Sequence, residues 1–436
     1  MFKITGKFTT ATVMIDDVEE KCIGQITKMA SHPSFTNPIA IMPDTHAGMS
    51  SVIGFTMPMV KDNIIPNVIG VDIGCGMLSM NFGRHIDRID LAKFDLDVRE
   101  EIPFGCRVND APVIDMKKDF PWEDVNNSLK VFINTYNEKF GTSHRSIEYD
   151  MNWFLAKCKQ IKVDPTRIIA GIGSLGGGNH FIEMGVDLNE DRWVTIHTGS
   201  RNFGKMICEF WQDRAHAAIL ERQPSLNDAI KEIRSKYTGH DIKTKIDEAR
   251  AKLSLSNTNS KDDLQCLVGS DAIGYLIDMI FAQAYAKFNR KYIGDAICRV
   301  LGGGFKDSIE CIHNYIDFDD MIIRKGSIRS YVGERMIIPF NMRDGILICE
   351  GKGNPDWNFS APHGAGRVLS RSGAKKSLSM DEFTEQMKDI YSTSVVPGTL
   401  DEAPGAYKDA AIIEDAIGPT ATIINRIKPI CNMKDN

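Results

Sequence analysis

The sequence predicts an α+β fold, and three observations support that class. Short apolar runs rich in β-branched residues recur along the chain, amphipathic helical stretches interrupt them, and the two kinds of segment do not alternate regularly. A doubly wound parallel sheet requires such an alternation, so we expect mixed sheets with surrounding helices. At 436 residues the chain is long enough to bury a large core.

Four of the apolar runs are predicted to be strands that lead into loops. They are Ile39 to Met42, Asn67 to Asp72, Trp193 to Ile196 and Gly345 to Cys349. The first gives way to a loop opening at Pro43-Asp44. Because loops at strand ends often share a cleft, polar residues just after these runs are candidates for a common site.

Four other segments are predicted to be helices. Apolar residues recur at helical spacing, with charges between them, in Met206 to Leu220, Leu226 to Tyr237 and Ile242 to Leu253. Ala272 to Phe288 is more apolar throughout and predicts a buried helix.

Composition limits the class of protein. The chain is 42% hydrophobic and 25% charged with a net charge of −6, which is typical of a globular protein without overall basicity. There is no run of 18 apolar residues, and Met1 to Thr10 lacks a signal-peptide pattern, so we expect a cytoplasmic protein with no membrane partner. Ten widely spaced cysteines without a C-x-x-C pair argue against a disulfide scaffold.

Five small clusters of metal-liganding and polar residues are the most informative feature of the chain. One thiolate, several imidazoles and a carboxylate suit a divalent transition metal, whereas magnesium and calcium prefer oxygen ligands. The clusters are Asp72 with Cys75, Asn179-His180, His197, His313-Asn314, and His363 with the turn that follows it.

Each cluster taken alone also has a plain structural interpretation. The glycines beside Cys75 let the chain turn tightly enough for a thiolate to bridge two metal ions, but a small buried cysteine in a turn fits equally. Residues 176–178 are glycines that allow a phosphate to approach the backbone, or they form a flexible turn. The loop at Pro43 to Gly48 adds a carboxylate, Asp44. A clustered histidine left free of metal can act as a nucleophile on phosphorus.

Taken together and in this order, the clusters resemble the motifs of the RtcB RNA ligases. The similarity extends from Pro43-Asp44 to a lysine near the C-terminus, Lys434. The motifs are Asp72-Ile73-Gly74-Cys75-Gly76, Gly178-Asn179-His180-Phe181-Ile182-Glu183, His197-Thr198-Gly199-Ser200-Arg201, His313-Asn314, His363-Gly364-Ala365-Gly366-Arg367 and Ala406-Tyr407-Lys408-Asp409.

The resemblance implies a fold, a reaction and two cofactors. The fold would be a single RtcB-like catalytic domain over residues 1–436, with a central metal and nucleotide cleft and a helical insertion at about 205–300. The reaction would join an RNA 3′-phosphate or 2′,3′-cyclic phosphate end to a 5′-hydroxyl end, in tRNA splicing or RNA repair. It would use GTP and two Mn²⁺ ions, and would pass through a guanylyl-histidine.

The same resemblance implies roles for individual residues. Cys75 would bridge the two ions, with His180 and His197 completing one site and Asp72 and His313 the other. His363 would be the nucleophile, Asp44 would assist the 5′-hydroxyl, and Arg201, Lys325 and Arg367 would hold RNA or triphosphate oxygens. The nucleotide contacts would come from Asn179, His180, Phe181, Ile182, Glu183, His313, Asn314, Pro339, Phe340, Asn341, Met342, His363, Gly364, Ala365, Gly366, Tyr407 and Lys434.

The chain departs from the family pattern at a few positions. Residues 339–343 lack the usual Gly-Ser pair, Ile346 stands where a nucleotide-binding serine is common, and two residues follow Lys434. The physiological RNA, the strictness of the GTP preference and any activating protein are therefore left open. Two alternatives also remain: a binuclear metallophosphoesterase, which needs no spare histidine, and a non-catalytic RNA-binding protein, which needs no thiolate-bridged metals.

Overall fold

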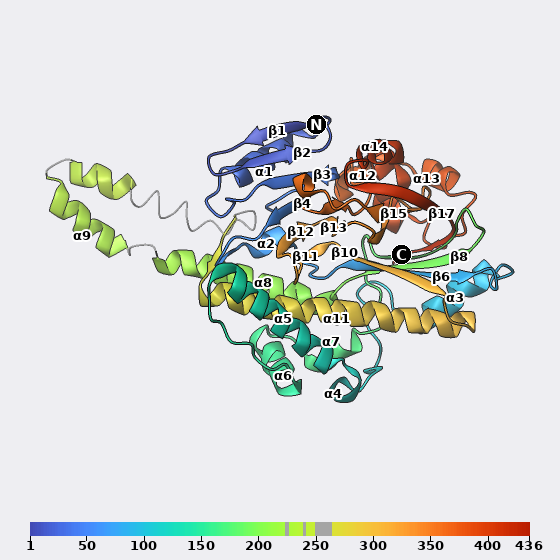
Figure 1. The fold of residues 1–436 in the computed structure, drawn as a ribbon. Coiled ribbons are helices and arrows are strands. Elements are labelled where there is room, and N and C mark those ends of the chain that lie inside the picture. Colours follow the sequence, from blue (N-terminus) through green and yellow to red (C-terminus); the bar gives the residue numbers. More distant parts are fainter. Residues whose placement is uncertain (223–225, 239–240, 249–263) are drawn as a thin grey trace.

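The computed structural model describes residues 1–222, 226–238, 241–248 and 264–436, which fold into two large β-sheets surrounded by helices (Figure 1). Two further pairs of short strands lie beside them: β13 (Ser327–Arg329) with β16 (Ser360–Pro362), and β5 (Asn63–Ile64) with β9 (Leu267–Val268). The predicted α+β class is confirmed.

The first large sheet has six strands. All neighbours are antiparallel except β2 and β3, which run parallel, so this sheet is mixed. The order across it is β1 (Phe2–Thr5), β2 (Thr10–Val13), β3 (Ile39–His46), β4 (Ile53–Pro58), β12 (Ile322–Lys325) and β11 (Asn314–Ile316).

The second large sheet has seven strands and is antiparallel throughout. Its order is β10 (Asp307–Ile312), β6 (Gly76–Gly83), β8 (Arg192–Thr198), β7 (Phe181–Val186), β17 (Ala421–Met433), β15 (Ile346–Gly351) and β14 (Arg335–Pro339).

The helices surround both sheets, and several begin where an aspartate or serine side chain accepts the first free backbone N–H groups. Asp90 caps α3 and Asp164 caps α7 in this way. The helices are α1 (Glu20–Ala30), α2 (Pro66–Ile69), α3 (Leu91–Glu101), α4 (Met116–Asp119), α5 (Trp122–Phe140), α6 (Met151–Gln160), α7 (Pro165–Ala170), α8 (Arg201–Arg222), α9 (Leu226–Lys236), α11 (Ser270–Leu301), α12 (Arg371–Ser377), α13 (Met380–Gln386), α14 (Ala410–Ala416), and the short 3₁₀ helices η1 (Pro355–Trp357), η2 (Pro397–Glu402) and η3 (Pro404–Ala406).

The long helix α11 is the main support of the seven-stranded sheet. It packs against β6 and β8 and is apolar on nearly all sides, because α5 and α8 contact it as well (Figure 1). The largest apolar core joins these helices to the six-stranded sheet, and a separate core fills the space between the seven-stranded sheet, α3 and α11. The seven-stranded sheet is therefore anchored on a rigid helix.

The predicted strands are confirmed with one exception. Residues 193–196 lie in β8 and residues 346–349 in β15. β3 continues through Asp44 to His46, beyond the predicted loop opening, with an irregular register against β4. The strand predicted at Asn67 to Asp72 is wrong, because Pro66 occupies the first position of the short helix α2 and Gly70 ends it at a φ of 104°.

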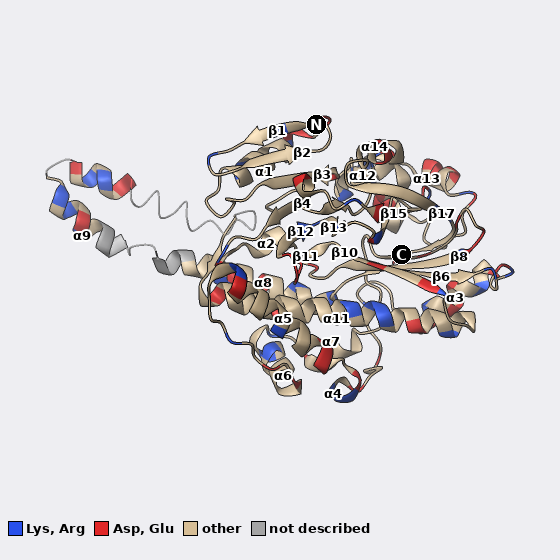
Figure 2. Ribbon diagram, in the orientation of Figure 1, with Lys and Arg blue, Asp and Glu red and all other residues tan. Residues whose placement is uncertain are grey.

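The predicted helices are confirmed where the structure describes them. They lie in α8, α9, α11 and the helical residues 241–248, while residues 249–253 of the third predicted helix fall outside the described part of the chain. Helix α9 stands apart from the sheets and carries charges of both signs (Figure 2). No helix within the described ranges is long and apolar enough to cross a membrane. The single-domain organisation and the cytoplasmic location stay predictions.

Candidate functional site

The strand register brings segments from distant parts of the sequence to one end of the seven-stranded sheet. The start of β6 pairs with the end of β8 and with the end of β10, and the start of β7 pairs with the end of β8. As a result Cys75 before β6, His180 before β7, His197 near the end of β8 and His313 after β10 converge. The structure thus brings together four of the five predicted metal ligands by backbone pairing alone.

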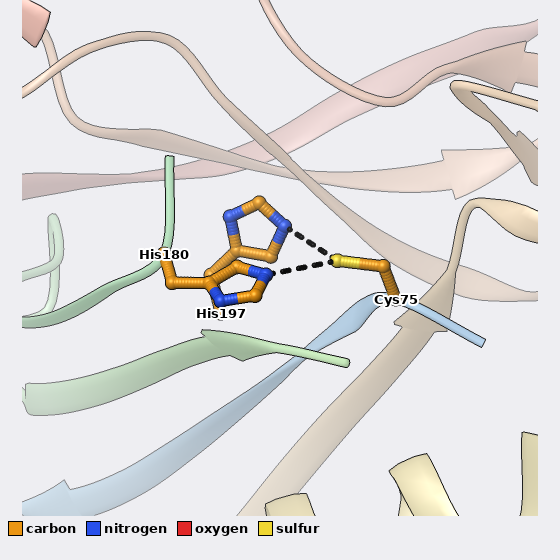
Figure 3. Close-up of side chains that lie close together, drawn as sticks. All are labelled: Cys75, His180 and His197. Atoms are coloured by element: carbon orange, nitrogen blue, oxygen red, sulfur yellow. Dashed lines mark hydrogen bonds between the residues drawn. The ribbon is translucent and has the colours of Figure 1, made fainter. Parts of the chain in front are cut away.

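Cys75, His180 and His197 form a compact group of potential metal donors (Figure 3). The Cys75 sulfur lies 3.5 Å from His180 Nε2 and 3.3 Å from His197 Nε2, and one donor atom from each residue lies within 4.8 Å of the others. All three side chains are buried. A thiolate and two imidazoles this close suit a transition metal.

Asp72 and His313 extend this group at its two sides. Asp72 Oδ2 lies 3.0 Å from His180 Nε2, and His313 Nε2 lies 3.3 Å from His197 Nε2. Asp72 Oδ1 accepts the backbone N–H of Ser200 at 3.1 Å, which fixes the carboxylate in place. The five donors are therefore contiguous, in the spatial order Asp72, His180, Cys75, His197 and His313.

Burial sets the protonation of the donors. It holds the pKa of His197 and His313 well below the usual range, with neighbouring imidazoles adding to the effect, so both rings are neutral and offer a lone pair. Burial also raises the pKa of Cys75 well above its usual range, and Asp72 raises it further. This raised pKa favours the protonated thiol. A divalent cation among these donors would favour the thiolate instead, because a coordinating thiol is deprotonated.

His363 lies next to the metal donors but is held by a different partner. It follows β16, and its ring centroid is 4.8 Å from that of His313. Its Nδ1 lies 2.6 Å from Oδ2 of the fully buried Asp44. With the Nδ1 proton donated to this carboxylate, Nε2 keeps its lone pair for other chemistry.

A cavity of about 560 Å³ opens beside these residues. Its volume suits a nucleotide-sized ligand. It is bounded by the metal donors His197 and His313, by the loop 339–342, by the turn 363–367 and by the C-terminal end of the chain.

Two buried acceptors at one end of the cavity have no hydrogen-bond partner among the described residues. They are Glu183 Oε1 and Asn432 Oδ1. The other oxygen of Glu183 accepts from Asn432 Nδ2 at 2.7 Å. Burial raises the pKa of Glu183 to about 8, although Asn432 and Lys434 act in the opposite direction. An unpaired buried acceptor is costly, so this end of the cavity is suited to a ligand that presents N–H donors.

The carboxylate of Glu402 organises the cations around the cavity. It is buried, accepts the Tyr407 hydroxyl at 2.6 Å, and forms ion pairs with Lys434 at 3.0 Å, Arg367 at 3.2 Å and Arg371 at 2.6 Å. Sequence reasoning missed Glu402, Arg371 and Asn432. The only signal for Glu402 was its position just before Ala406-Tyr407-Lys408-Asp409.

Comparison with known proteins identifies the family of this chain. The family model described as tRNA-splicing ligase RtcB matches residues 25–435. The chain belongs to the RtcB family. It is 26% identical to the RNA-splicing ligase RtcB of Escherichia coli strain K12 over 96% of this chain and 95% of that protein. It is 25% identical to the tRNA-splicing ligase RtcB of Nanoarchaeum equitans over 95% of this chain and 92% of that protein. The resemblance seen in the motifs is therefore confirmed.

Most residues expected to contact nucleotide in an RtcB protein do line the cavity. They are Asn179, Phe181, Glu183, His313, Asn314, Pro339, Phe340, Asn341, Met342, His363, Gly364, Ala365, Gly366, Tyr407 and Lys434. His180 faces Cys75 instead. Ile182 is fully buried in the core on the opposite face of β7, because successive side chains of a strand point to opposite faces.

The structure places the three cations expected to hold phosphates in this RtcB protein differently from one another. Arg367 lines the cavity. Arg201 donates to Ser174 Oγ at 3.0 Å and to Gly105 O at 2.7 Å. Lys325 is buried and donates to the carbonyls of Met49 and Asn67 and to the Ser51 hydroxyl at 2.8–2.9 Å. Burial lowers its pKa to about 7. Of these three cations only Arg367 lines the cavity, and its guanidinium also donates to Leu369 O and Asp401 O and pairs with Glu402.

Proposed function

We propose that this protein is a GTP- and manganese-dependent RNA ligase that joins a 3′-phosphate or 2′,3′-cyclic phosphate end to a 5′-hydroxyl end. Membership of the RtcB family supports the ligase class. The observation that carries the chemistry is a histidine, His363, which is held by Asp44 and not by the metal donors, and which faces a nucleotide-sized cavity beside them.

The donor group is suited to two Mn²⁺ ions. Asp72, Cys75, His180, His197 and His313 offer one thiolate, one carboxylate and three imidazoles, and buried Nδ1 atoms of His180 and His313 have no partner among the described residues. Bound there, the ions would act as Lewis acids that neutralise charge on the phosphate oxygens of the substrates. The division of the ligands between two ions follows the family resemblance.

His363 would be the nucleophile toward GTP. Its Nε2 lone pair would attack the α-phosphorus, a nitrogen–phosphorus bond would form, and pyrophosphate would leave. Asp44 would stabilise the positive charge that develops on the ring, since it accepts the Nδ1 proton at 2.6 Å. Arg367, which also lines the cavity, would hold phosphate oxygens of GTP or RNA.

The RNA would complete the cycle in two transfers. A cyclic phosphate would first be opened by water to a 3′-phosphate. An oxygen of that 3′-phosphate would take the guanylate from His363, and the 5′-hydroxyl would then displace GMP to form the phosphodiester. Arg201 and Lys325 would act in this cycle by holding loops, because they do not line the cavity and they donate to backbone carbonyls.

Guanine selectivity would come from Glu183, Asn432 and Lys434. Guanine presents two N–H donors on N1 and N2 and one acceptor, O6, whereas adenine presents the reverse arrangement. The unpaired Glu183 Oε1 matches the donors, and Lys434 Nζ, which lies 5.4 Å from the centre of the Phe181 ring, matches O6. Asn179, whose backbone oxygen accepts from Lys434 Nζ at 3.4 Å, also lines the cavity.

The two alternative functions lack support from this arrangement. A metallophosphoesterase needs no histidine held apart from the metals, and an RNA-binding protein needs no buried thiolate among imidazoles. Incubation with α-labelled GTP and Mn²⁺ separates all three functions. We expect label on the wild-type protein, a matching increase in its intact mass, and neither on His363→Ala. Surface His85→Ala is the control. Wild type that stays unlabelled, or labelled His363→Ala, would refute the proposal.

A further inference from the structure

Two consecutive residues in the middle of α11, Asn289 and Arg290, are completely buried although both are strongly polar. Burying an arginine without close partners costs several kcal/mol, so such residues need many hydrogen bonds. Neither residue lines the cavity, and neither belongs to the five proposed metal donors. Their partners show what they do.

Arg290 connects the chain beside three of the proposed metal ligands. Its Nη1 donates to Gly74 O at 2.7 Å, immediately before Cys75, and to Thr198 O at 3.1 Å, immediately after His197. Its Nε donates to Glu310 Oε1 at 3.0 Å, on the strand that ends before His313.

Asn289 makes the same kind of connection to the chain near His180. Its Oδ1 accepts the Gly173 N–H at 2.8 Å, and its Nδ2 donates to Ser174 O at 3.2 Å, so both contacts lie at the start of the glycine-rich turn that reaches His180 six residues after Ser174. The same Nδ2 also donates to Gly199 O at 3.2 Å, in the segment that follows His197.

The four segments that carry the proposed ligands come from far-apart parts of the sequence, and this dipeptide contacts all of them. It does so from a 32-residue helix that lies along the sheet (Figure 1). A rigid helix fixes these partners relative to one another, and ligand geometry within a few tenths of an ångström determines metal affinity.

We propose that Asn289 and Arg290 are positioning residues for the metal centre, holding the backbone segments of all the ligands at coordination distance. They would touch neither metal nor substrate. This inference rests on the proposed metal centre and adds to it the part of the fold that sets its geometry.

The test measures metal binding directly, with Mn²⁺ titration by calorimetry and with Co²⁺ absorption, where a thiolate-to-cobalt charge-transfer band reports on Cys75. For Arg290→Met and Asn289→Ala we expect roughly 10- to 100-fold weaker binding, the range seen when supporting partners of metal ligands are removed. The charge-transfer band should be weaker or shifted. Arg290→Lys should recover part of the affinity, since one ammonium replaces only some of the bonds.

Arg324→Met is the matched control. Arg324 is equally buried and also bonds backbone carbonyls and carboxylates, but its partners are Asp317, Asp320, Ser360 and Phe359. Metal affinity of its folded form should stay within about twofold of wild type. Circular dichroism and thermal unfolding establish how much folded protein each variant contains, and Arg290→Lys carries the test if Arg290→Met does not fold.

The outcomes separate this inference from the proposed function. Wild type that binds neither Mn²⁺ nor Co²⁺ would refute the metal centre itself. Wild-type affinity and an unchanged cobalt spectrum in the folded Asn289 and Arg290 variants would overturn only the positioning role. An equal loss of affinity in Arg324→Met would overturn it too, because the effect would then be general destabilisation.

Discussion

Asp44 and His363 lie 319 residues apart in the sequence and are joined by a 2.6 Å hydrogen bond between Oδ2 and Nδ1. The same carboxylate oxygen accepts the backbone N–H of His363 at 3.1 Å, so one buried atom fixes both the ring and the peptide that carries it. Two strands of different chain regions, β3 and β16, therefore meet at the proposed nucleophile.

The first prediction concerns Asp44→Asn. A neutral amide cannot stabilise the imidazolium that forms during attack and can reverse the ring tautomer, so we expect transfer of label from GTP to protein to slow by roughly 10²- to 10⁴-fold. A quenched time course measures this rate. Mn²⁺ affinity should be unchanged, because Asp44 bonds none of the five donor side chains within the described residues. A labelling rate within a few-fold of wild type would contradict the role of Asp44.

The second prediction concerns metal removal. A ligand that binds only the folded state stabilises it by about 2.7 kcal/mol at a free concentration 100 times its Kd. Thermal unfolding should therefore occur at higher temperature with Mn²⁺ than with a chelator in wild type. In Cys75→Ala the difference in unfolding temperature between Mn²⁺ and chelator should largely vanish. Cys158→Ala, which alters a buried cysteine of α6 instead, should keep the wild-type difference. A full Mn²⁺ effect in Cys75→Ala would exclude the thiolate as a ligand.

Elements that are determined by a short stretch of sequence could be predicted, whereas the pairing of distant segments could not. Strands such as β8 were predictable because a β-branched run with a polar end has few alternatives. The run at 67–72 has similar composition, but Pro66 fixes φ for the start of a helix, and this outweighed strand propensity. The pairing order of the seven-stranded sheet depends on contacts between distant segments, which no local pattern contains.

The site was predictable where a motif marked it and not elsewhere. The clustered histidines and Cys75 stood out as residue types, and backbone register brought them together. The orientation of a long cationic side chain, in contrast, could not be predicted from the sequence. Arg367 and Lys325 are equally plausible phosphate ligands in the sequence, but only the fold decides that Arg367 lines the cavity and that Lys325 is buried away from it. Glu402 was missed because three of its four partners, Arg367, Arg371 and Lys434, lie 31 to 35 residues away in the sequence.

The third prediction concerns nucleotide choice through Glu183→Gln. Burial keeps the Glu183 carboxyl largely protonated in the free protein, whereas the two guanine N–H donors would favour its charged form. An amide cannot take up that charge, and hydrogen bonds to charged groups contribute about 1.5–3 kcal/mol. GTP affinity should fall by roughly 10- to 100-fold, while the weaker ATP affinity should change little. Competition binding with both nucleotides measures the ratio. Equal losses for GTP and ATP would show that Glu183 supports the cavity without reading the base.

The fourth prediction concerns the acid stability that Glu402 contributes. Burial alone would raise its pKa, but Lys434, Arg371, the Tyr407 hydroxyl and Arg367 outweigh burial and lower it from 4.5 to about 2. Because the folded pKa lies below the unfolded one, the unfolded chain binds more protons between these values. The stabilisation, about 3 kcal/mol, is thus fully present above pH 4.5 and is lost as the pH falls toward 2.

Glu402→Gln tests this directly, since glutamine keeps the shape and does not titrate. The free energy of unfolding of wild type should exceed that of the variant by the largest amount near pH 7, and the gap should narrow steadily below pH 4.5. Chemical denaturation at several pH values measures it. Glu382→Gln, which changes an exposed glutamate of α13, should leave the free energy of unfolding and its pH dependence as in the wild type. If this difference in the free energy of unfolding were independent of pH, Glu402 would stabilise the fold through packing and hydrogen bonds and not through its charge.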